Sequence, residues 1–269
     1  MRMRVFFAVF LTLSPYFLLG QSLQVNTADT LVQNSLVNTC PSKGNSASFR
    51  NATSYIYPAS MLAFGFLANN SHPLRDFNES IQEEVWEMAP RRGTFEVEDY
   101  LQNVPVYSVF ALNAVGVKGK NGTIDRIALY GISNLLMTQS VSRLKIWSGK
   151  LRPDGSDRRS FPSGHAANAF ATAEFMRLEY KDVSPVYGLV AYGIAATTGA
   201  FRIYHNNHWF SDVVAGAGIG ILSTHISYFT YPKIKKIVAK IVRTDDSNFR
   251  LAPIYQNRTT GLSVIFNPN

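Results

Sequence analysis

The sequence predicts an all-α protein, a helical bundle with a short C-terminal β-hairpin. Apolar segments of helical length alternate with short turns rich in Gly and Pro along the middle of the chain. Hydrophobic residues make up 46% of the 269 residues, which is enough for the core of one domain. Strand-like residues at 249–255 and 262–266, with a turn at 257–261 between them, predict the hairpin.

The chain divides into four parts. Residues 1–20 combine a basic start, an apolar run and a small residue before Gln21, which is typical of a cleaved secretory signal peptide. An uncleaved anchor is the alternative. We expect a polar N-terminal arm at residues 21–52 and a helical domain at 53–232, with the candidate functional residues at 145–212. A basic segment and the hairpin occupy 233–269.

Helical patterns follow one another through the domain. Asp99 is the expected cap of the third of these helices, and Ser163 the expected start of the fifth. Gly216, Gly218 and Gly220 lie in a helical pattern, which indicates close packing against another helix and not a dinucleotide-binding loop. The expected helices are 55–69, an amphipathic acidic helix at 75–88, 100–116, 123–148, 163–180, 184–201 and 212–231.

The apolar segments leave two relations to a membrane open. Residues 183–201 and 213–232 are each about long enough to span a bilayer, but they are rich in Gly, Ala, Thr and Tyr. A bundle that buries its own apolar faces explains them without lipid. We therefore favour a periplasmic or envelope protein, soluble or peripherally attached, over an integral membrane protein. The basic stretch 233–243 suits either an anionic membrane surface or solvent.

Charge and cysteine content limit the partners. The chain has a net charge of +8, and 8 of its 18 acids lie within residues 76–99, so the remainder is strongly basic. This favours anionic partners such as phosphate esters and lipid headgroups. No long Lys/Arg run is interleaved with aromatic residues, which argues against nucleic acid. Cys40 is the only cysteine, so an intramolecular disulfide is excluded.

Three segments between 145 and 212 concentrate groups that could hold a phosphate. Lys145 and Arg152 are seven residues apart, which on a helix places them on nearly the same face. Because Pro153 ends a helix at or before Arg152, we expect this arginine to project from the helix end. Together the two cations could grip one phosphoryl group, although an isolated pair of this kind is most often solvated.

The second segment, Ser163-Gly164-His165, has the features of a helix start. Ser163 is a good N-cap, and Gly164 permits a close approach of a ligand to the backbone. The free N–H groups and the helix dipole attract an anion. His165 in the first turn could donate a proton to a leaving oxygen. Simple capping explains most isolated instances of this tripeptide.

The third segment places Arg202 six residues before His208, and Asp212 four residues after it. On a helix His208 and Asp212 share a face, so the carboxylate could fix the tautomer of a nucleophilic imidazole. A structural histidine held by an aspartate is one alternative. A metal site of His205, His208 and Asp212 is another, but convergent Lys145, Arg152 and Arg202 would repel a cation.

Jointly the segments read K-x6-RP, PSGH and R-x5-H-x3-D, and in this the sequence resembles the type 2 phosphatidic acid phosphatase and vanadium haloperoxidase superfamily. Phe201 departs from the pattern, which usually has Ser there. The resemblance implies that superfamily's helical bundle and metal-free phosphomonoester hydrolysis. His208 would be the nucleophile, Asp212 would orient it, and His165 would be the general acid. The phosphate-binding residues would be Lys145, Arg152, Ser163, Gly164 and Arg202.

We therefore expect a phosphatase without cofactor or metal that acts on phosphomonoesters. The substrates would be lipid phosphates such as phosphatidate, isoprenyl diphosphate or lipid A, or the protein would be a non-specific acid phosphatase. Arg158, Arg159 and His205 are candidate contacts to the substrate headgroup. The alternatives are a vanadate-dependent haloperoxidase with the same pocket and a non-catalytic phosphate-binding envelope protein. The sequence specifies no oligomeric state.

Overall fold

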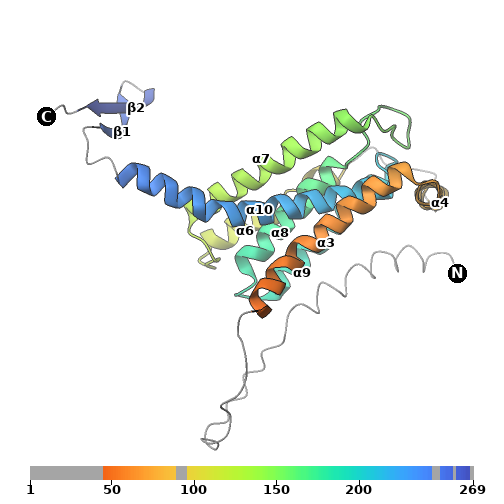
Figure 1. Ribbon diagram of the computed structural model, residues 1–269, viewed down its shortest axis with the longest axis horizontal. Coiled ribbons are helices and arrows are strands. Elements are labelled where there is room, and N and C mark those ends of the chain that lie inside the picture. The colour runs from red at the N-terminus through yellow and green to blue at the C-terminus, as the bar shows by residue number, and fades with distance from the viewer. Residues whose placement is uncertain (1–44, 89–95, 244–248, 257–258, 267–269) are drawn as a thin grey trace, which may run out of the picture.

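The computed structural model describes residues 45–88, 96–243, 249–256 and 259–266 of the chain. Helices make up the bundle, and one antiparallel hairpin lies beyond the end of the last helix (Figure 1). The predicted signal peptide and residues 21–44 lie outside the described residues. The elements are α3 Asn45–Asn70, α4 His72–Met88, α5 Glu98–Leu101, α6 Val104–Ala114, α7 Thr123–Ser148, α8 Gly164–Tyr180, α9 Pro185–Tyr204, α10 Phe210–Arg243, β1 Phe249–Gln256 and β2 Thr259–Phe266.

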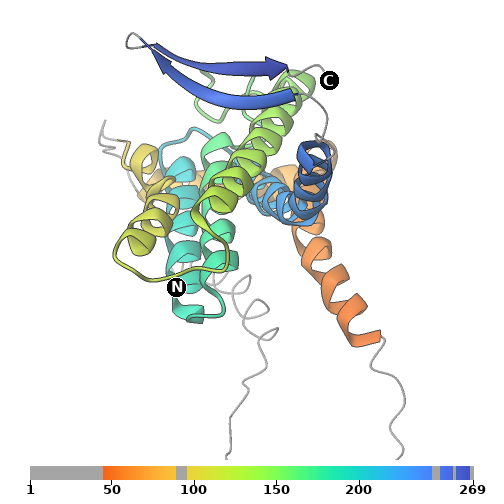
Figure 2. The ribbon, with the colours of Figure 1, turned by 90° about the vertical axis from the view of Figure 1, so that its left-hand side faces the viewer.

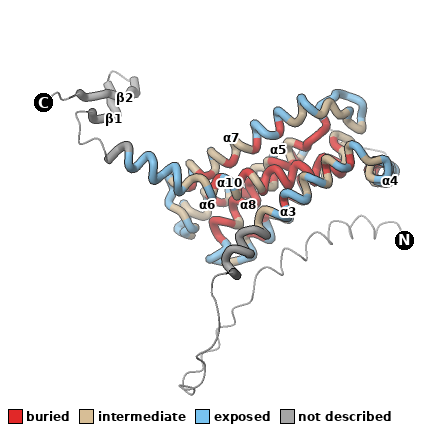
Figure 3. Tube along the Cα trace, viewed as in Figure 1, coloured by how far each residue is buried: buried red, intermediate tan, exposed pale blue. Residues whose placement is uncertain are grey.

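Helices α8 and α10 form the centre of the bundle. α10 packs against α8, α3 and α7, while α9 and α6 cover α8 from the other side (Figures 1 and 2). The buried residues are concentrated on α8 and on the first half of α10 (Figure 3). One cluster of the core, which includes Phe175, Tyr180 and Val109, joins α6, α8 and α9. A second, around Ile203 and Val213, lies under α3 and α4 near the beginning of α10.

The contact between α8 and α10 depends on glycine. A Cβ atom at Gly220 would lie 2.1 Å from the carbonyl oxygen of Ala167, and one at Gly216 would lie 2.4 Å from the carbonyl oxygen of Ser163. On the opposite side of α10, a Cβ at Gly218 would lie 2.5 Å from the carbonyl oxygen of Pro58 in α3. The glycines therefore allow backbones to approach where any side chain would clash, as the sequence predicted.

Local signals placed several helix boundaries correctly. α7 has the predicted bounds, and the helix ends because Gly149 adopts a left-handed conformation with φ 53°. Ser163 caps α8 as expected: its hydroxyl accepts a hydrogen bond from the N–H of Ala166 at 3.4 Å. Ser184 likewise caps α9, with Pro185 at the first helical position.

Other boundaries differ from the predictions. α3 begins at Asn45, so the last part of the predicted polar arm is helical. The predicted helix 100–116 is divided into α5 and α6, because Pro105 in the first turn of α6 cannot donate the hydrogen bond that a continuous helix needs. α10 continues through the basic segment to Arg243. The hairpin is present, but β2 begins at Thr259, inside the predicted turn.

The termini of four helices meet at one end of the bundle. The C-terminal ends of α7 and α9 lie there beside the N-terminal ends of α8 and α10, and the N–H of Ser163 donates to the carbonyl of Asp212 at 2.9 Å. Within the described residues one helix, Phe210–Lys240, is long and apolar enough to cross a membrane, and 67% of its apolar window is buried inside the bundle.

Candidate active site

His208 lies in the loop between α9 and α10, and only 1% of the residue is exposed. Its N–H donates to the carbonyl of Arg202 at 3.2 Å, and its Nδ1 faces Asp212 Oδ2 at 3.9 Å. Burial lowers the pKa of His208 to about 4. The charges of Lys145 and Arg202 also lower this pKa, whereas Asp212 raises it. The imidazole is therefore neutral at ordinary pH.

The sequence was right that His208 and Asp212 are neighbours but wrong about the reason. α10 begins at Phe210, so His208 precedes the helix and the two residues do not share a helical face. The loop brings them together. Asp212 is completely buried, and its Oδ2 accepts hydrogen bonds from the Ser160 hydroxyl and from the N–H of Trp209.

Lys150 completes the surroundings of Asp212, and sequence reasoning did not single it out. Its ammonium lies 2.8 Å from Asp212 Oδ1. Burial alone would raise the pKa of Asp212, but the facing imidazole of His208 and the charge of Lys150 hold it below its usual range. The sequence does carry a signal for it: between Lys145 and Arg152 there is one further lysine, Lys150.

Arg202 is buried at the end of α9 and is bound by acidic side chains. Its Nη1 donates to Glu98 Oε1 at 3.1 Å and to Glu96 Oε2 at 3.2 Å. His205 Nδ1 lies 2.7 Å from the same Glu98 oxygen. His205 is thus bound to Glu98, and its ring stacks on Phe201. A metal site shared with His208, or a free contact to a substrate headgroup, would need an unoccupied His205 ring nitrogen at that position.

His165 occupies the first turn of α8, as predicted. Its Nε2 lies 2.7 Å from Asp99 Oδ1. Burial and the charge of Arg202 lower the pKa of His165, and Asp99 opposes this shift. Asp99 is consequently not the helix cap that the sequence predicted: it lies inside the first turn of α5, where Val97 is the cap residue, and it holds His165.

Ser163 and Gly164 lie where α8 begins. Ser163 is completely buried. The first N–H groups of a helix have no partner within it, so this end of α8 presents donors to an anion. An open cavity of about 330 Å³ reaches Gly164 and is bordered by Asn168 of α8 and by Asn134, Thr138 and Ser142 of α7.

Lys145 and Arg152 come from different elements. Lys145 is in the last turn of α7, and its ammonium donates to the carbonyl of Arg159 at 2.7 Å. Burial, with a contribution from the charge of Arg152, lowers the pKa of Lys145 to about 8. Arg152 lies in the loop after Gly149, so the prediction that it projects from the helix end is wrong.

Arg152 is held by two partners. Its Nε donates to Asp157 Oδ1 at 2.8 Å, and its Nη1 donates to the carbonyl of Asn207 at 3.4 Å. Arg158 and Arg159 are exposed in the same loop. The charges of Lys145 and Arg202 therefore both act on His208, and that of Arg202 also acts on His165. The charge of Arg152 acts on Lys145, while Arg158 and Arg159 stay on the surface.

A buried imidazole thus lies among cations and helix ends at one end of a helical bundle. Residues 127–236 match the family model of the PAP2 superfamily. A curated relative is the "Lipid A 1-phosphatase" of Porphyromonas gingivalis, which is 37% identical over 140 residues, covering 51% of this chain. The chain spans 32% of the length of that relative.

Two solved structures are similar at low identity. The crystal structure of LpxE from Aquifex aeolicus is 22% identical, with a TM-score of 0.42, and the match covers 54% of this chain and 93% of that one. The transmembrane PAP2-type phosphatidylglycerolphosphate phosphatase from Bacillus subtilis is 21% identical, with a TM-score of 0.46, and the match covers 66% of this chain and 97% of that one.

Proposed function

We propose that the protein is a metal-independent phosphomonoester hydrolase that works through a phosphohistidine at His208. The observation that carries the proposal is the buried, neutral His208, whose Nδ1 faces Asp212 while the charges of Lys145 and Arg202 act on the ring. A neutral imidazole is nucleophilic, and cations close to it offset the charge that develops on a transferring phosphoryl group.

In the proposed first half-reaction, His208 Nε2 forms a bond to phosphorus while the bond from phosphorus to the ester oxygen breaks. His165 gives its proton to that departing oxygen. Lys145, Arg152, Arg202 and the start of α8 at Ser163 and Gly164 bind the other phosphoryl oxygens. In the second half-reaction, water attacks phosphorus, gives a proton back to His165 and releases phosphate and free His208.

We propose a lipid phosphate as the substrate. The curated relative is named for lipid A, and the cavity at Gly164 offers room for the body of a leaving group. Apolar side chains are also exposed near Lys145: Ile146 at 77%, Trp147 at 68% and Leu151 at 46%. Exposed apolar and aromatic groups that neighbour Lys145 along the chain suit the boundary between headgroup and acyl chain. We place the protein at the cell envelope on the same grounds.

The test is phosphate release from lipid A 1-phosphate, phosphatidate and a small soluble phosphomonoester, each with excess chelator. We expect activity with chelator present, faster on the lipids, and lost in His208→Ala. Replacement of the exposed His72, as His72→Ala, is the matched control and should leave the rate unchanged. Rapid acid-free quenching should trap an acid-labile phosphoenzyme in wild type only. Activity that requires added metal, or that survives in His208→Ala, contradicts the proposal.

A further inference from the structure

The fully buried carboxylate of Asp212 faces His208, and Lys150, a lysine outside the predicted site, is paired with this carboxylate. Lys150 Nζ is 2.8 Å from Asp212 Oδ1 and 3.2 Å from Ser211 Oγ. The Asp212 side chain is 0% exposed, while that of Lys150 is 20% exposed. Ser160 and the Trp209 N–H, which are both neutral donors, occupy the other carboxylate oxygen.

A buried carboxylate stays ionised only where a nearby cation compensates its charge. His208 does not supply that charge, because burial keeps its imidazole neutral. Lys145 acts on Asp212 through its charge but donates its hydrogen bond to the carbonyl of Arg159. Arg202 is paired with Glu98 and Glu96, so neither cation forms an ion pair with Asp212. Asn78 of α4 faces the same region through Ser211 and is uncharged.

Among the described residues, Lys150 is thus the one Lys or Arg in ion-pair contact with Asp212. We propose that Lys150 is a positioning residue of the His208–Asp212 pair: its ammonium holds the Asp212 carboxylate ionised beside a neutral His208. The inference rests on the proposed function of His208 as nucleophile.

The chain holds Lys150 in this place from several directions. Gly149, in its left-handed conformation, turns the backbone away from α7, and the Lys150 carbonyl accepts from the N–H of Ser160 at 3.0 Å. The ammonium lies 5.9 Å from the ring centroids of both Phe161 and Trp209, a distance at which cation–π attraction operates. Lys150 is therefore fixed and not a solvated surface lysine.

Removal of this ammonium has a definite electrostatic consequence. Asp212 would then have lost its ion-pair partner, and the His208–Asp212 pair would take up a proton at higher pH than before. Whether the proton resides on the imidazole or on the carboxylate, the reactive state is lost, because it requires a neutral His208 next to an ionised Asp212. The acid limb of the pH profile should thus move to higher pH.

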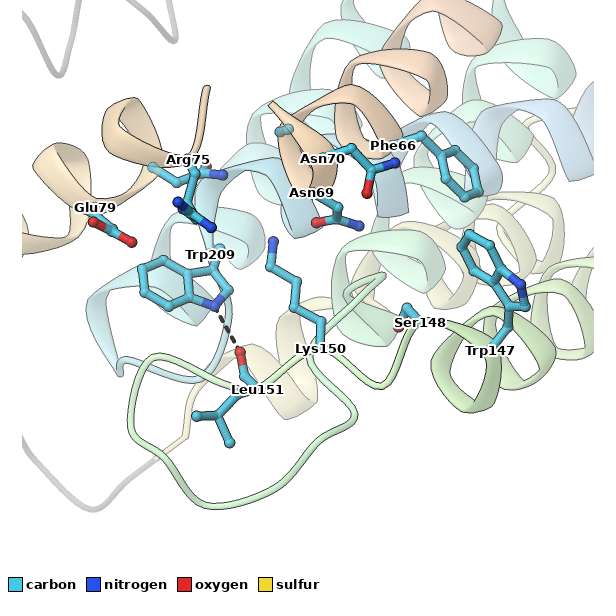
Figure 4. Close-up of a pocket in the computed structure, with 12 residues that line it drawn as sticks. Phe66, Asn69, Asn70, Arg75, Glu79, Trp147, Ser148, Lys150, Leu151 and Trp209 are labelled. Atoms are coloured by element: carbon cyan, nitrogen blue, oxygen red, sulfur yellow. Dashed lines mark hydrogen bonds between the residues drawn. The ribbon is translucent and has the colours of Figure 1, made fainter. Parts of the chain in front are cut away.

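A cavity gives solvent access to Lys150, as Figure 4 shows. It has a volume of about 460 Å³, and its lining includes Asn69, Arg75 and Trp209 as well as Lys150. If Lys150 is shortened to Ala, an alkylammonium ion of suitable length can enter from this cavity and take the place of the lost side chain. A neutral alcohol of the same shape cannot supply the charge.

The experiment compares Lys150→Ala and Lys150→Arg with wild type, and the exposed lysine variant Lys181→Ala is the matched control. We expect the acid limb of kcat/KM on a small phosphomonoester to move up by about one pH unit or more in Lys150→Ala. Lys150→Arg and Lys181→Ala should retain the wild-type profile. Added n-propylammonium should restore Lys150→Ala toward the wild-type profile, and n-propanol should not.

An NMR titration of the imidazole nitrogens separates this inference from the proposed function, because it needs no turnover. The pKa of the His208–Asp212 pair should rise in Lys150→Ala. A rise in a protein without phosphatase activity would sustain the electrostatic coupling between Lys150 and the His208–Asp212 pair and reject the proposed function. The inference would be overturned by an active Lys150→Ala enzyme with three properties: the wild-type pKa of the His208–Asp212 pair, the wild-type acid limb, and no response to propylammonium.

A second variant covers loss of folding. If Lys150→Ala fails to fold, the double variant Lys150→Ala/Asp212→Asn should fold, since it removes the uncompensated charge along with the lysine. A double variant that unfolds as readily as the single one would also overturn the inference.

Discussion

The replacement of Gly220 by Ala tests the central contact of the bundle. The new Cβ would lie 2.1 Å from the carbonyl oxygen of Ala167 and 2.8 Å from the amide nitrogen of Ala171. The first distance is about 1.3 Å short of the 3.4 Å at which ordinary contact begins, so α10 and α8 must separate. Both atoms belong to the backbone and cannot rotate away.

The expected magnitude follows from two opposing contributions. Overpacking costs typically about 1–3 kcal/mol, and rigid backbone partners place this site at the upper end. The better helix propensity of Ala returns about 1 kcal/mol. A net loss of about 2 kcal/mol corresponds to a Tm about 4–8 °C lower for a chain of this size.

The matched control is Gly193→Ala in α9, where a Cβ would meet no atom within 4 Å. The same substitution there should raise the Tm by about 2–4 °C, because only the propensity gain remains. Thermal unfolding of both variants, followed by circular dichroism, gives the comparison. Equal shifts of the same sign would refute the close approach of α8 and α10.

Three further predictions concern the site and its surroundings. Activity should be greatest between about pH 4 and the lowered pKa of His165, because His208 must be unprotonated and His165 protonated. In Asp99→Asn the pKa of His165 should fall further, so the alkaline limb of kcat/KM should move to lower pH; an unmoved limb would show that Asp99 does not act on the general acid. Ser163→Ala should lower stability by about 0.5–1 kcal/mol through the lost cap, and kcat/KM by more than tenfold if the hydroxyl also binds phosphate. Denaturant unfolding and steady-state kinetics separate these two effects. Alkaline carbonate should release the protein from membranes if α10 is a core helix, and retention in the pellet would favour a spanning segment.

Signals that are local in sequence predicted the framework of the site well. Gly149 and Ser163 act on their own turns of the chain, and the structure has α7 ending and α8 beginning at these positions. By contrast, the spacing arguments for Arg152 and His208 assumed helix on both sides, and both residues lie in loops. Their neighbourhood depends on how the loops fold, which a residue count does not contain.

The partners of the site could not be found in this way because they come from distant segments. Glu98 and Asp99 belong to an early acidic stretch in which Asp99 was expected only as a helix cap, yet they engage Arg202 and His165 more than 60 residues away. Lys150 was hidden for another reason. Lys150 lies between Lys145 and Arg152, the two residues that define the motif, and so is not itself part of the pattern. Its partner, Asp212, becomes a neighbour only after α10 has packed against α8.

Packing and chemistry are therefore coupled at the beginning of α8. The carbonyl oxygen of Ser163 is the atom that a Cβ at Gly216 would strike, and the N–H of Ser163 donates to the carbonyl of Asp212. A backbone contact between α8 and α10 thus sets how far the start of α8 lies from Asp212. The start of α8 would bind phosphate, and the carboxylate of Asp212 faces His208. A change that widens this contact would move the proposed phosphate-binding groups away from the proposed nucleophile, His208, without replacing a charged residue. For this reason we expect the glycines of α10 to affect activity as strongly as they affect stability, and most of all Gly216.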